Sequence, residues 1–372
     1  MRIALLVTHL LGTGHLKRAS LLADGFVRAG HEATVISGGF PAPNANPDLA
    51  SLVQLSPVRS DASFSALYGE DGEATAALYA QRRIEIGESL TGISPDMLIT
   101  ELFPFGRRKL APEYEAAIEA AGDALIYSSI RDILQYPRKE GRAAEAEARF
   151  ERFYHGAFVH GDPALVPLEE SWRLPEALAQ RLDYTGYIAE PDASLVSPQN
   201  PQSAGEGEII VAAGGGSVGD RLFEAAADAG GAHWRLLVGG HDKDKRIAAL
   251  KSRGGRTMIE PTRPDFRTLL ANADLAILQC GYNTAMDVVQ SGIRALFVPF
   301  EGDGETEQIT RARAFEQRFQ CGVLREKDLN ADALSAAVQR LLQTPKPDYG
   351  MISMAGIERT IHLAETALAE RV

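Results

Sequence analysis

His15 is the side chain with the most direct capacity for acid–base chemistry, and it follows two glycines in the segment Leu11–Arg18 (LGTGHLKR). An imidazole titrates near neutral pH, so it can take a proton from an attacking hydroxyl group. A helical pattern starts beside His15, and the positive end of a helix lowers the pKa of an imidazole there. Gly12 and Gly14 allow the backbone to approach a ligand closely. A histidine that only caps or packs the helix is the alternative.

A glycine-rich segment, 213–220 (AGGGSVGD), lies directly between a predicted strand and a predicted helix. Its three consecutive glycines let the backbone approach a ligand, and the free N–H groups at the helix start can bind a diphosphate. The segment lacks the Gly-Lys-Ser/Thr of a P-loop, which disfavours a P-loop ATPase. An ordinary tight turn between strand and helix is the other interpretation.

The segment 279–308 holds the densest set of groups suited to binding a ligand. Gly281 permits a sharp turn after an apolar strand, and Asn283 or Thr284 can cap the helix that follows. The start of that helix is a second anion site. Asp287, one turn further along, can accept hydrogen bonds from ligand hydroxyl groups.

Two aromatic and three basic residues fall within Phe103–Lys109 (FPFGRRK), which follows a predicted strand. The basic side chains from Arg107 onward could meet an anionic acceptor or a membrane surface. Three charges in one loop are also typical of a solvated surface. Ser128–Asp132 (SSIRD) and His160–Asp162 (HGD) end strands as well, and the sequence does not reveal their roles.

The fingerprint of a dinucleotide-binding site is incomplete. Lys17 stands where G-x-G-x-x-G has its third glycine, and the second predicted strand ends in Ser37–Gly39 without an acidic residue to bind a ribose. NAD binding is therefore not expected.

Apolar periodicity predicts the elements that position these groups. Short apolar runs alternate with helical patterns, a βαβ rhythm that is typical of mostly parallel α/β sheets. Predicted strands cover 2–8, 32–37, 96–100, 124–128, 156–160, 208–213, 234–238, 257–260, 274–278 and 295–300. Predicted helices cover 16–29, 72–90, 140–152, 242–251, 264–272, 332–342 and 357–370, with others starting at 219 and 283. Residues 41–57, rich in Pro and Asn, are expected to form a loop.

Length and composition limit the function classes. A chain of 372 residues favours two domains, and residues 184–202, rich in Pro, Ser, Asn and Gln, are the expected linker. The net charge of −12 argues against non-specific binding of nucleic acid. Cys280 and Cys321 provide neither a disulfide framework nor a metal motif, so the cytoplasm is the expected compartment. The apolar start of the chain is interpreted as a first strand, not a signal peptide.

The pattern G-x-x-T-x-x-D from Gly281 to Asp287, followed by G-x-x-ALFVPF from Gly292 to Phe300, resembles the nucleotide-binding half of GT-B glycosyltransferases. The chain is most similar to the MurG family (glycosyltransferase family 28) over 209–314, and the N-terminal half resembles it partially. The resemblance implies two Rossmann-like α/β domains facing across a cleft. These are an acceptor-binding domain over 1–185 and a nucleotide-sugar-binding domain over 203–350. A C-terminal helix in 351–372 would pack back on the first domain.

The same resemblance implies roles for individual residues, with His15 as the catalytic base. The donor side would comprise Gly214, Gly215, Gly216, Ser217, Ile259, Phe266, Gly281, Asn283, Thr284, Asp287, Glu307 and Gln308. The acceptor side would comprise Gly12, Gly14, Phe103, Arg107 and Arg131. The family usually has Glu at the position of Asp287 and Gln-Gln at Glu307–Gln308. These departures indicate a shorter reach toward a ribose, and a sugar other than N-acetylglucosamine or a different hydroxyl pattern.

The expected function is an inverting transfer of a sugar from a UDP-sugar to a hydroxyl acceptor, such as a lipid or cell-envelope precursor. No cofactor and no metal are expected, because the loops predicted to face the diphosphate carry no Asp-x-Asp motif and a helix dipole can replace the cation. A nucleotide-sugar hydrolase of the same fold and a non-catalytic nucleotide-sugar-binding protein are the alternatives, since G-x-G-H also resembles the hydrolase of pseudaminic acid synthesis. Peripheral contact with the inner membrane is a further option, and the oligomeric state stays open.

Overall fold

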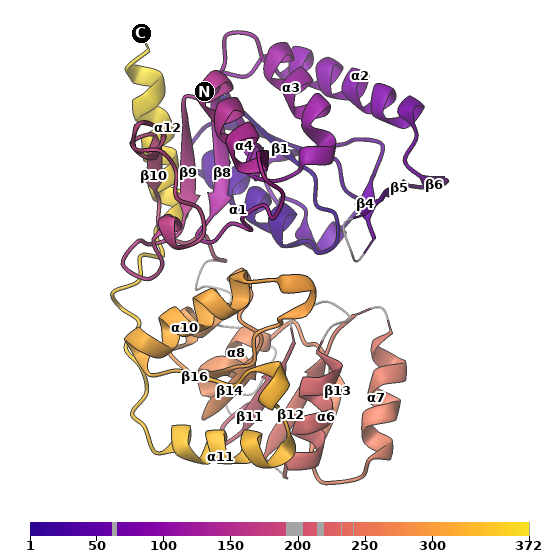
Figure 1. The fold of residues 1–372 in the computed structure, drawn as a ribbon, viewed down its shortest axis with the longest axis vertical. Coiled ribbons are helices and arrows are strands. Elements are labelled where there is room, and N and C mark those ends of the chain that lie inside the picture. Colours follow the sequence, from indigo (N-terminus) through magenta and orange to yellow (C-terminus); the bar gives the residue numbers. More distant parts are fainter. Residues whose placement is uncertain (62–64, 191–203, 214–218, 232, 241, 372) are drawn as a thin grey trace. The chain divides into compact units, whose positions relative to one another are not determined.

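The structure is a computed structural model that describes residues 1–61, 65–190, 204–213, 219–231, 233–240 and 242–371. The chain divides into two compact units (Figure 1). Unit 1 comprises Met1–Ala189 and Ser353–Val372, and unit 2 comprises Glu190–Ile352. Unit 1 is therefore built from both the first and the last parts of the chain. None of the described helices is long and apolar enough to cross a membrane.

Unit 1 is organised around a parallel sheet of seven strands in the described residues. In spatial order these are β10 (Leu182–Tyr184), β9 (Gly156–His160), β8 (Leu125–Arg131), β7 (Met97–Glu101), β1 (Arg2–Val7), β2 (Glu32–Ser37) and β3 (Ser51–Gln54). The chain builds outward from β1 to β3 and then returns to the other side of β1 with β7. The order of the strands thus reverses between β1 and β7. Both strands are covered on their two faces, which explains their nearly continuous apolar sequences.

Unit 2 repeats this plan with a parallel sheet of six described strands. In spatial order these are β13 (Met258–Pro261), β12 (Trp234–Val238), β11 (Ile209–Ala212), β14 (Leu275–Leu278), β15 (Arg294–Phe297) and β16 (Gly322–Val323). This is the 3-2-1-4-5-6 order of a doubly wound nucleotide-binding sheet, with its reversal between β11 and β14. The prediction of parallel βαβ domains is confirmed in both units.

Helices connect the strands in each unit. Unit 1 contains α1 (Gly14–Arg28), α2 (Ala76–Ile93), α3 (Ala111–Ala120), α4 (Arg142–Phe153) and α5 (Glu176–Ala179). Unit 2 contains α6 (Asp220–Ala229), α7 (Lys243–Ser252), α8 (Phe266–Asn272), α9 (Tyr282–Ser291), α10 (Glu307–Phe319) and α11 (Ala331–Leu342). At the end of α9, Gly292 has a φ of 65°, the left-handed conformation that glycine adopts at little cost.

The last helix, α12 (Gly356–Ala369, yellow in Figure 1), packs on α1 of unit 1. Gly25 of α1 makes this close packing possible, because a Cβ placed there would lie 2.2 Å from Cγ2 of Ile357. His31 Nε2 also lies 3.0 Å from Oε1 of Glu365. The final helix is therefore a part of unit 1.

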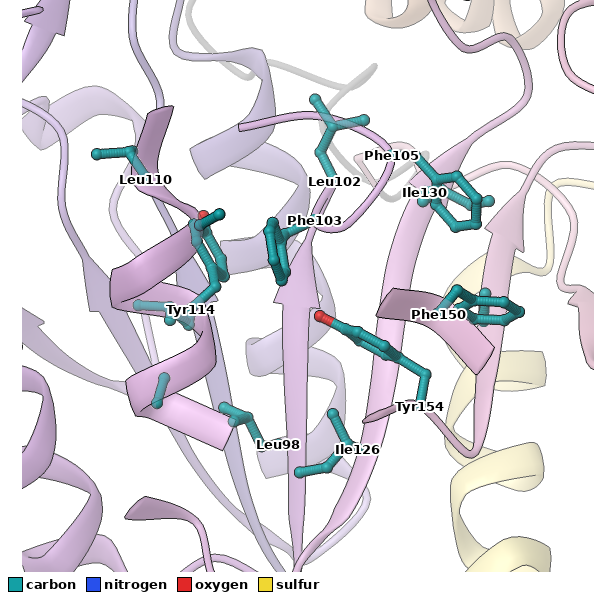
Figure 2. Close-up of a cluster of buried hydrophobic side chains, with 14 of the residues drawn as sticks. Leu98, Leu102, Phe103, Phe105, Leu110, Tyr114, Ile126, Ile130, Phe150 and Tyr154 are labelled. Atoms are coloured by element: carbon teal, nitrogen blue, oxygen red, sulfur yellow. The ribbon is translucent and has the colours of Figure 1, made fainter. Parts of the chain in front are cut away.

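The core of unit 1 has two apolar clusters, one on each face of its sheet. Alternate residues of β1 enter different clusters, with Ala4 and Leu6 in one and Leu5 and Val7 in the other. Figure 2 shows the first cluster, where aromatic rings from the loop after β7 and from α3 and α4 meet. The ring centroids of Phe103 and Tyr114 are 4.7 Å apart. This packing holds the carboxyl end of β7 in place.

Three predicted elements are corrected by the structure. Residues 41–57 are not one loop, because they contain the edge strand β3, whose four residues are too few to show alternation. The helix predicted from residue 72 begins at Ala76, after a small antiparallel sheet of β4 (Arg59–Ser60), β5 (Leu67–Gly69) and β6 (Gly72–Glu73). The first part of the predicted linker is buried in unit 1, since Tyr187 OH donates to Oδ2 of Asp132 at 3.1 Å.

Candidate active site

The candidate site of unit 1 lies where the strand order reverses. β1 leads through a short loop into α1, and the neighbouring β7 ends at Glu101. The two strands are paired, with Leu6 opposite Thr100. In open α/β sheets, ligands bind outside the carboxyl ends of the strands at this kind of reversal. His15, in the first turn of α1, meets Glu101 at this position.

A buried carboxylate holds His15. Its Nδ1 lies 2.8 Å from Oε1 of Glu101, and the side chains are 17% and 3% exposed, respectively. Arg18, on the next turn of α1, hydrogen-bonds to the same glutamate oxygen and lies 3.3 Å from His15 Nδ1. An ionised carboxylate only accepts hydrogen bonds, so the tautomer assigned to His15 carries its proton on Nδ1. Nε2 then keeps a lone pair that can accept a proton.

The surroundings of His15 keep its imidazole neutral. Burial is the main cause that lowers the pKa of His15 to about 3, Arg107 and Arg131 act in the same direction, and Glu101 opposes them. The expected direction of the shift is present, but the cause differs from the one inferred from sequence, which was the helix end alone. A neutral imidazole at physiological pH is the form that a general base requires.

Glu101 stays ionised although it is buried. Burial raises its pKa, but Arg18, His15 and Ser129 outweigh this effect and hold the pKa of Glu101 well below its usual range. Ser129, opposite Glu101 on β8, donates from Oγ to Oε2 at 2.7 Å. Both carboxylate oxygens are therefore hydrogen-bonded. A carboxylate fixed in this way can orient an imidazole and stabilise the imidazolium that forms when it takes a proton.

Four of the five residues predicted for the acceptor side lie around this pair. Gly12 is exposed in the loop after β1, and Gly14 is the first residue of α1. Arg107 and Arg131 are close enough to affect the pKa of His15. Arg107 has a φ of 59°, uncommon for a residue with a side chain, and its buried Nε has no hydrogen-bond partner among the described residues. An unsatisfied buried donor beside a strained backbone is a feature of ligand sites.

Phe103 is the exception, and its predicted place on the acceptor side is corrected. Its side chain is 1% exposed and packs between Tyr114 and Tyr154 in the core (Figure 2). Its carbonyl oxygen accepts hydrogen bonds from Thr100 and Ser128 at 3.0 and 2.8 Å. The loop folds back on the sheet, so the Phe103 side chain packs in the core and does not face a ligand.

Unit 2 presents its loops at the corresponding reversal. β11 and β14 are paired with Ala212 opposite Leu278, so the segments that follow them leave the same edge of the sheet. The glycine-rich segment starts after Ala213, and a Cβ on Gly219 at its end would lie 3.5 Å from Nε2 of Gln279. The segment thus begins and ends beside the turn after β14. Four predicted donor contacts lie outside the described residues: Gly214, Gly215, Gly216 and Ser217.

The start of α9 differs in detail from the prediction. The N-cap is Gly281, and Asn283 and Thr284 are the second and third residues of the helix. Neither is a cap, because the extended conformation of Gly281 lets the helix begin one residue earlier. No side chain of the described residues caps this helix start. The N–H groups at the start of a helix are the groups that bind an anion.

Asp287, on the second turn of α9, is already engaged by a cation. Its Oδ1 lies 3.0 Å from Nε of Arg267 on α8. Burial raises the pKa of Asp287 to about 6, although Arg267 lowers it, and Glu190 adds to the rise. A ligand hydroxyl would share this carboxylate with Arg267. The arginine offers a physical reason why a shorter acid is accommodated here.

Glu307 and Gln308 have separate structural roles at the start of α10. Glu307 is buried and its Oε1 pairs with Nη2 of Arg311 at 2.9 Å, so it does not face a sugar as predicted. Arg311 in turn donates to the carbonyl oxygen of Cys280 at 2.8 Å. Gln308 Oε1 accepts from the backbone N–H groups of Cys280 and Phe300, both at 3.1 Å. This leaves the two N–H groups of Gln308 Nε2 to donate to a ligand.

The residues predicted near a nucleobase lie on neighbouring elements. Ile259 is buried in β13, so only its backbone could contact a base. Phe266 is the partly buried first residue of α8.

An Asp-Lys-Asp sequence spans the start of α7 at 242–244. In the part of the chain that the structure describes, no group of three or more His, Cys, Asp or Glu side chains is placed to hold a metal ion.

The sequence interpretation missed Glu101 and Arg18, and it singled out the segment Ser128–Asp132 without a role for Ser129. Glu101 is 86 positions from His15, and nothing in local periodicity connects them. A usable signal was present, since Glu101 directly follows an apolar strand and a base of this kind needs an acidic partner. Arg18 was hidden for another reason, because arginine in a helix is usually a solvated residue, whereas here it is 3% exposed.

The two sheets, their strand orders and the return of α12 to unit 1 define the GT-B fold class. The fold of MurG from Acinetobacter baumannii matches with a TM-score of 0.64 and 13% identity, covering 98% of this chain and 100% of that chain. The calicheamicin glycosyltransferase CalG4 matches with a TM-score of 0.63 and 16% identity, covering 100% of this chain and 94% of that one. The fold inferred from sequence is confirmed.

The sequence of unit 2 and α12 narrows the class further. Residues 218–367 match the glycosyltransferase family 28 C-terminal domain. Curated relatives include the UDP-N-acetylglucosamine--N-acetylmuramyl-(pentapeptide) pyrophosphoryl-undecaprenol N-acetylglucosamine transferases of two bacteria. The Pelobacter propionicus enzyme is 29% identical over 109 residues, 29% of each chain. The Paraburkholderia phymatum enzyme is 28% identical over 174 residues, 43% of this chain and 46% of the relative. The chain spans less than half the length of these relatives.

Proposed function

We propose that the protein is an inverting glycosyltransferase that moves a sugar from a UDP-sugar to a hydroxyl group of an acceptor. The observation that carries the proposal is the hydrogen bond between His15 Nδ1 and the ionised Glu101, at 2.8 Å. It leaves Nε2 of a neutral imidazole as a proton acceptor at the reversal of a GT-B sheet. A family 28 C-terminal domain in the same chain supports a nucleotide-sugar donor.

In unit 1, His15 would act on the acceptor. Nε2 takes the proton of the acceptor hydroxyl while its oxygen forms a bond to the anomeric carbon of the sugar. The bond between that carbon and the phosphate oxygen breaks, and the leaving diphosphate keeps the electron pair. Glu101 stabilises the imidazolium that results, as a buried carboxylate does for other histidine bases.

In unit 2, backbone N–H groups would stabilise the leaving diphosphate. The uncapped start of α9 supplies such groups, and the segment after β11 leaves the same edge of the sheet. Asp287 would accept hydrogen bonds from the ribose, and Gln308 Nε2 would donate to the sugar. The family resemblance implied two polar contacts to the sugar, one from Glu307 and one from Gln308. Because Glu307 is paired with Arg311, only Gln308 is proposed to contact the sugar. This supports a donor other than UDP-N-acetylglucosamine.

The acceptor is proposed to be an anionic, lipid-linked precursor at the cytoplasmic face of the inner membrane. The names of the curated relatives specify a pyrophosphoryl-undecaprenol acceptor. In this chain, Arg107 and Arg131 lie beside His15, and Arg108 and Lys109 are exposed on the same loop. A cationic surface next to the base suits an acceptor that carries phosphate.

The proposal is tested by measuring stabilisation and turnover. Thermal unfolding is followed with UDP-, dTDP- and GDP-sugars, NAD and ATP, because a ligand that binds the folded state raises the unfolding midpoint. The stabilising sugar nucleotide is then incubated with and without a lipid extract of bacterial envelopes, and release of its nucleoside diphosphate is measured. Release that requires the extract indicates transfer, and equal release without it indicates hydrolysis.

Two variants complete this test. His15→Gln should keep donor binding and lose most of the turnover, whereas His362→Gln, on the exposed surface of α12, should change neither. Stabilisation by NAD or ATP and by no sugar nucleotide would overturn the proposal.

A further inference from the structure

Glu101 connects His15 to a second, fully buried histidine through a chain of hydrogen bonds. Ser129 Oγ lies 2.7 Å from Oε2 of Glu101 and 2.9 Å from Nε2 of His160. On the other side of that ring, His160 Nδ1 lies 2.9 Å from Oγ1 of Thr185. His160, Ser129 and Thr185 are buried, with exposed fractions of 0%, 3% and 2%. The proposed transfer step makes no use of these three side chains.

The parallel strands place these groups side by side. Glu101 on β7 and Ser129 on β8 are register partners, and His160 ends the next strand, β9. Thr185 follows β10 and donates its backbone N–H to the carbonyl oxygen of Val159 at 3.0 Å. Four neighbouring strands thus each contribute one member at their carboxyl ends. His15 from α1 is the member at the open end of the chain.

The donors and acceptors fix one direction for the protons. The carboxylate of Glu101 can only accept, so the single hydroxyl proton of Ser129 points toward it. Ser129 Oγ must then accept from His160, which places a proton on Nε2 of that ring. Burial lowers the pKa of His160 to about 3, so the ring is neutral and its Nδ1 is an acceptor. Thr185 Oγ1 lies 2.9 Å from this nitrogen, and the same hydroxyl lies 2.9 Å from the carbonyl oxygen of Gly186 and 3.3 Å from that of Val159. The donors of Ser129 and His160 both point toward Glu101.

We propose that Ser129, His160 and Thr185 are positioning residues that fix the orientation of Glu101 and thereby hold His15 with Nε2 as its proton acceptor. The inference rests on the proposed function for its consequence in catalysis. The groups that face His15 come from every surrounding element: Arg18 from α1, Glu101 from β7, Arg107 from the loop after β7, and Arg131 from β8. Among them only Glu101 accepts the proton on Nδ1, so its orientation decides which nitrogen of His15 is free.

A purely structural role is the competing explanation, because any buried polar group needs a partner. The chain offers a matched control in Ser128, the neighbour of Ser129 on β8. Ser128 is also fully buried, and its hydroxyl donates to the carbonyl oxygen of Phe103 at 2.8 Å on the other face of the sheet. Ser128→Ala removes one buried hydrogen bond and Ser129→Ala removes two, and only Ser129→Ala breaks the chain to His15.

The first readout is independent of any substrate. In protein labelled with nitrogen-15 at histidine, the wild type at pH 7–8 should show His15 protonated on Nδ1 and His160 protonated on Nε2. The signals are assigned with His15→Gln and His160→Gln. Ser129→Ala should add a second tautomer of His15, and Ser128→Ala should not. A His160 protonated on Nδ1 in the wild type, or an identical His15 signal in both alanine variants, would overturn the inference.

The second readout uses turnover. Ser129→Ala should lower kcat about 10-fold with little change in KM, a fraction of the ~10²–10⁴-fold that a general base contributes. Ser128→Ala should keep kcat within a factor of about two, and its unfolding midpoint should fall less, because it loses one buried hydrogen bond where Ser129→Ala loses two. Ser129→Thr, which keeps the hydroxyl, should recover most of the loss. Equal kcat for the two alanine variants contradicts a positioning role, whereas predicted tautomers in a chain that turns over no sugar nucleotide contradict only the proposed function.

Discussion

At the scale of single residues, replacing Glu101 is expected to affect both the candidate base and the stability of unit 1. It accepts hydrogen bonds from His15, Arg18 and Ser129, and it is the acidic partner of a buried arginine. Its removal therefore affects both the base and the charge balance of unit 1. The two effects are separable, because a second buried pair, Arg82 with Glu113 at 2.9 Å, lies in the same unit without contacting His15.

Glu101→Gln keeps the shape of the side chain and removes its charge. We expect turnover to fall by about 10²-fold or more, since the imidazolium loses its counter-charge. The free energy of unfolding should fall by about 3–5 kcal/mol, because the buried Arg18 loses its ion pair with Glu101. Glu113→Gln, measured by the same denaturant titration and assay, should destabilise to a similar extent and leave turnover per folded molecule unchanged. Equal loss of turnover in both variants would contradict the role of Glu101.

The depressed pKa of His15 predicts how stability depends on pH. The group titrates near 6.5 when unfolded and at about 3 when folded, so between these values only the unfolded chain binds the proton. The free energy of unfolding therefore increases by up to about 4–5 kcal/mol as pH rises from about 3 to 6.5. The same contribution disappears as pH falls through this range. His160 has the same shift and adds to the slope. In urea titrations from pH 4 to 8, His15→Gln should show a smaller slope than the wild type.

The raised pKa of Asp287 predicts a change of stability with pH in the opposite direction. Its pKa is raised to about 6, so the folded chain holds a proton that the unfolded chain releases above about 3.8. Stability is lost as pH rises through this window, by up to about 3 kcal/mol. Asp287→Asn should therefore raise the unfolding midpoint of unit 2 at pH 7.5 while weakening the binding of a sugar nucleotide. An unchanged affinity in this variant would remove Asp287 from the donor site.

At the scale of elements, local patterns predicted what local physics decides. The apolar runs of β9 and β12 were predicted with the bounds that the structure shows, because both strands are continuous buried segments. The helix caps were less predictable. Asn283 and Thr284 are common capping types, yet Gly281 precedes the helix, because the chain turns directly after β14. The short edge strand β3 has no apolar repeat long enough to reveal it.

Two helical glycines provide a test of how α12 is held. Gly25 in α1 faces Ile357 at a distance where a Cβ would collide, and Gly87 in α2 has no atom within 4 Å of a Cβ. Gly87→Ala should stabilise the protein by up to about 1 kcal/mol, because alanine favours the helix. Gly25→Ala should instead destabilise it and expose the chain near Ser353 to proteases. Thermal unfolding and limited proteolysis measure both outcomes, and stabilisation by both changes would show that α12 does not pack as described.

At the scale of the whole molecule, the two parallel α/β sheets were accessible from sequence and the polar contacts were not. The βαβ rhythm and the resemblance around Gly281–Phe300 were sufficient for two parallel units. Pairs such as His15 with Glu101, or Glu307 with Arg311, depend on which side chain points inward at the end of an element. Polar residues follow no period that would show this. The candidate residues could be assigned to strand ends from the sequence, but the side chains that contact them could not be predicted.

The two units also make separate predictions for ligands. UDP should slow amide exchange in the segments after β11 and β14 of unit 2 more than in the loop that precedes α1 of unit 1, because backbone N–H groups of unit 2 are expected to bind the diphosphate. Hydrogen exchange followed by mass spectrometry measures both regions in one sample. Protection confined to unit 1 would show that UDP binds unit 1, and it would contradict a donor site in unit 2.

The position of α12 has a consequence for how the protein is made. Residues 353–372 complete unit 1, although all of unit 2 precedes them in the chain. On a ribosome, residues 1–189 emerge before unit 2, but α1 receives its cover from α12 only after the whole intervening segment has been made. The surface of α1 that packs on α12 is thus left uncovered throughout synthesis of unit 2. During translation, unit 1 is started before unit 2 and finished after it.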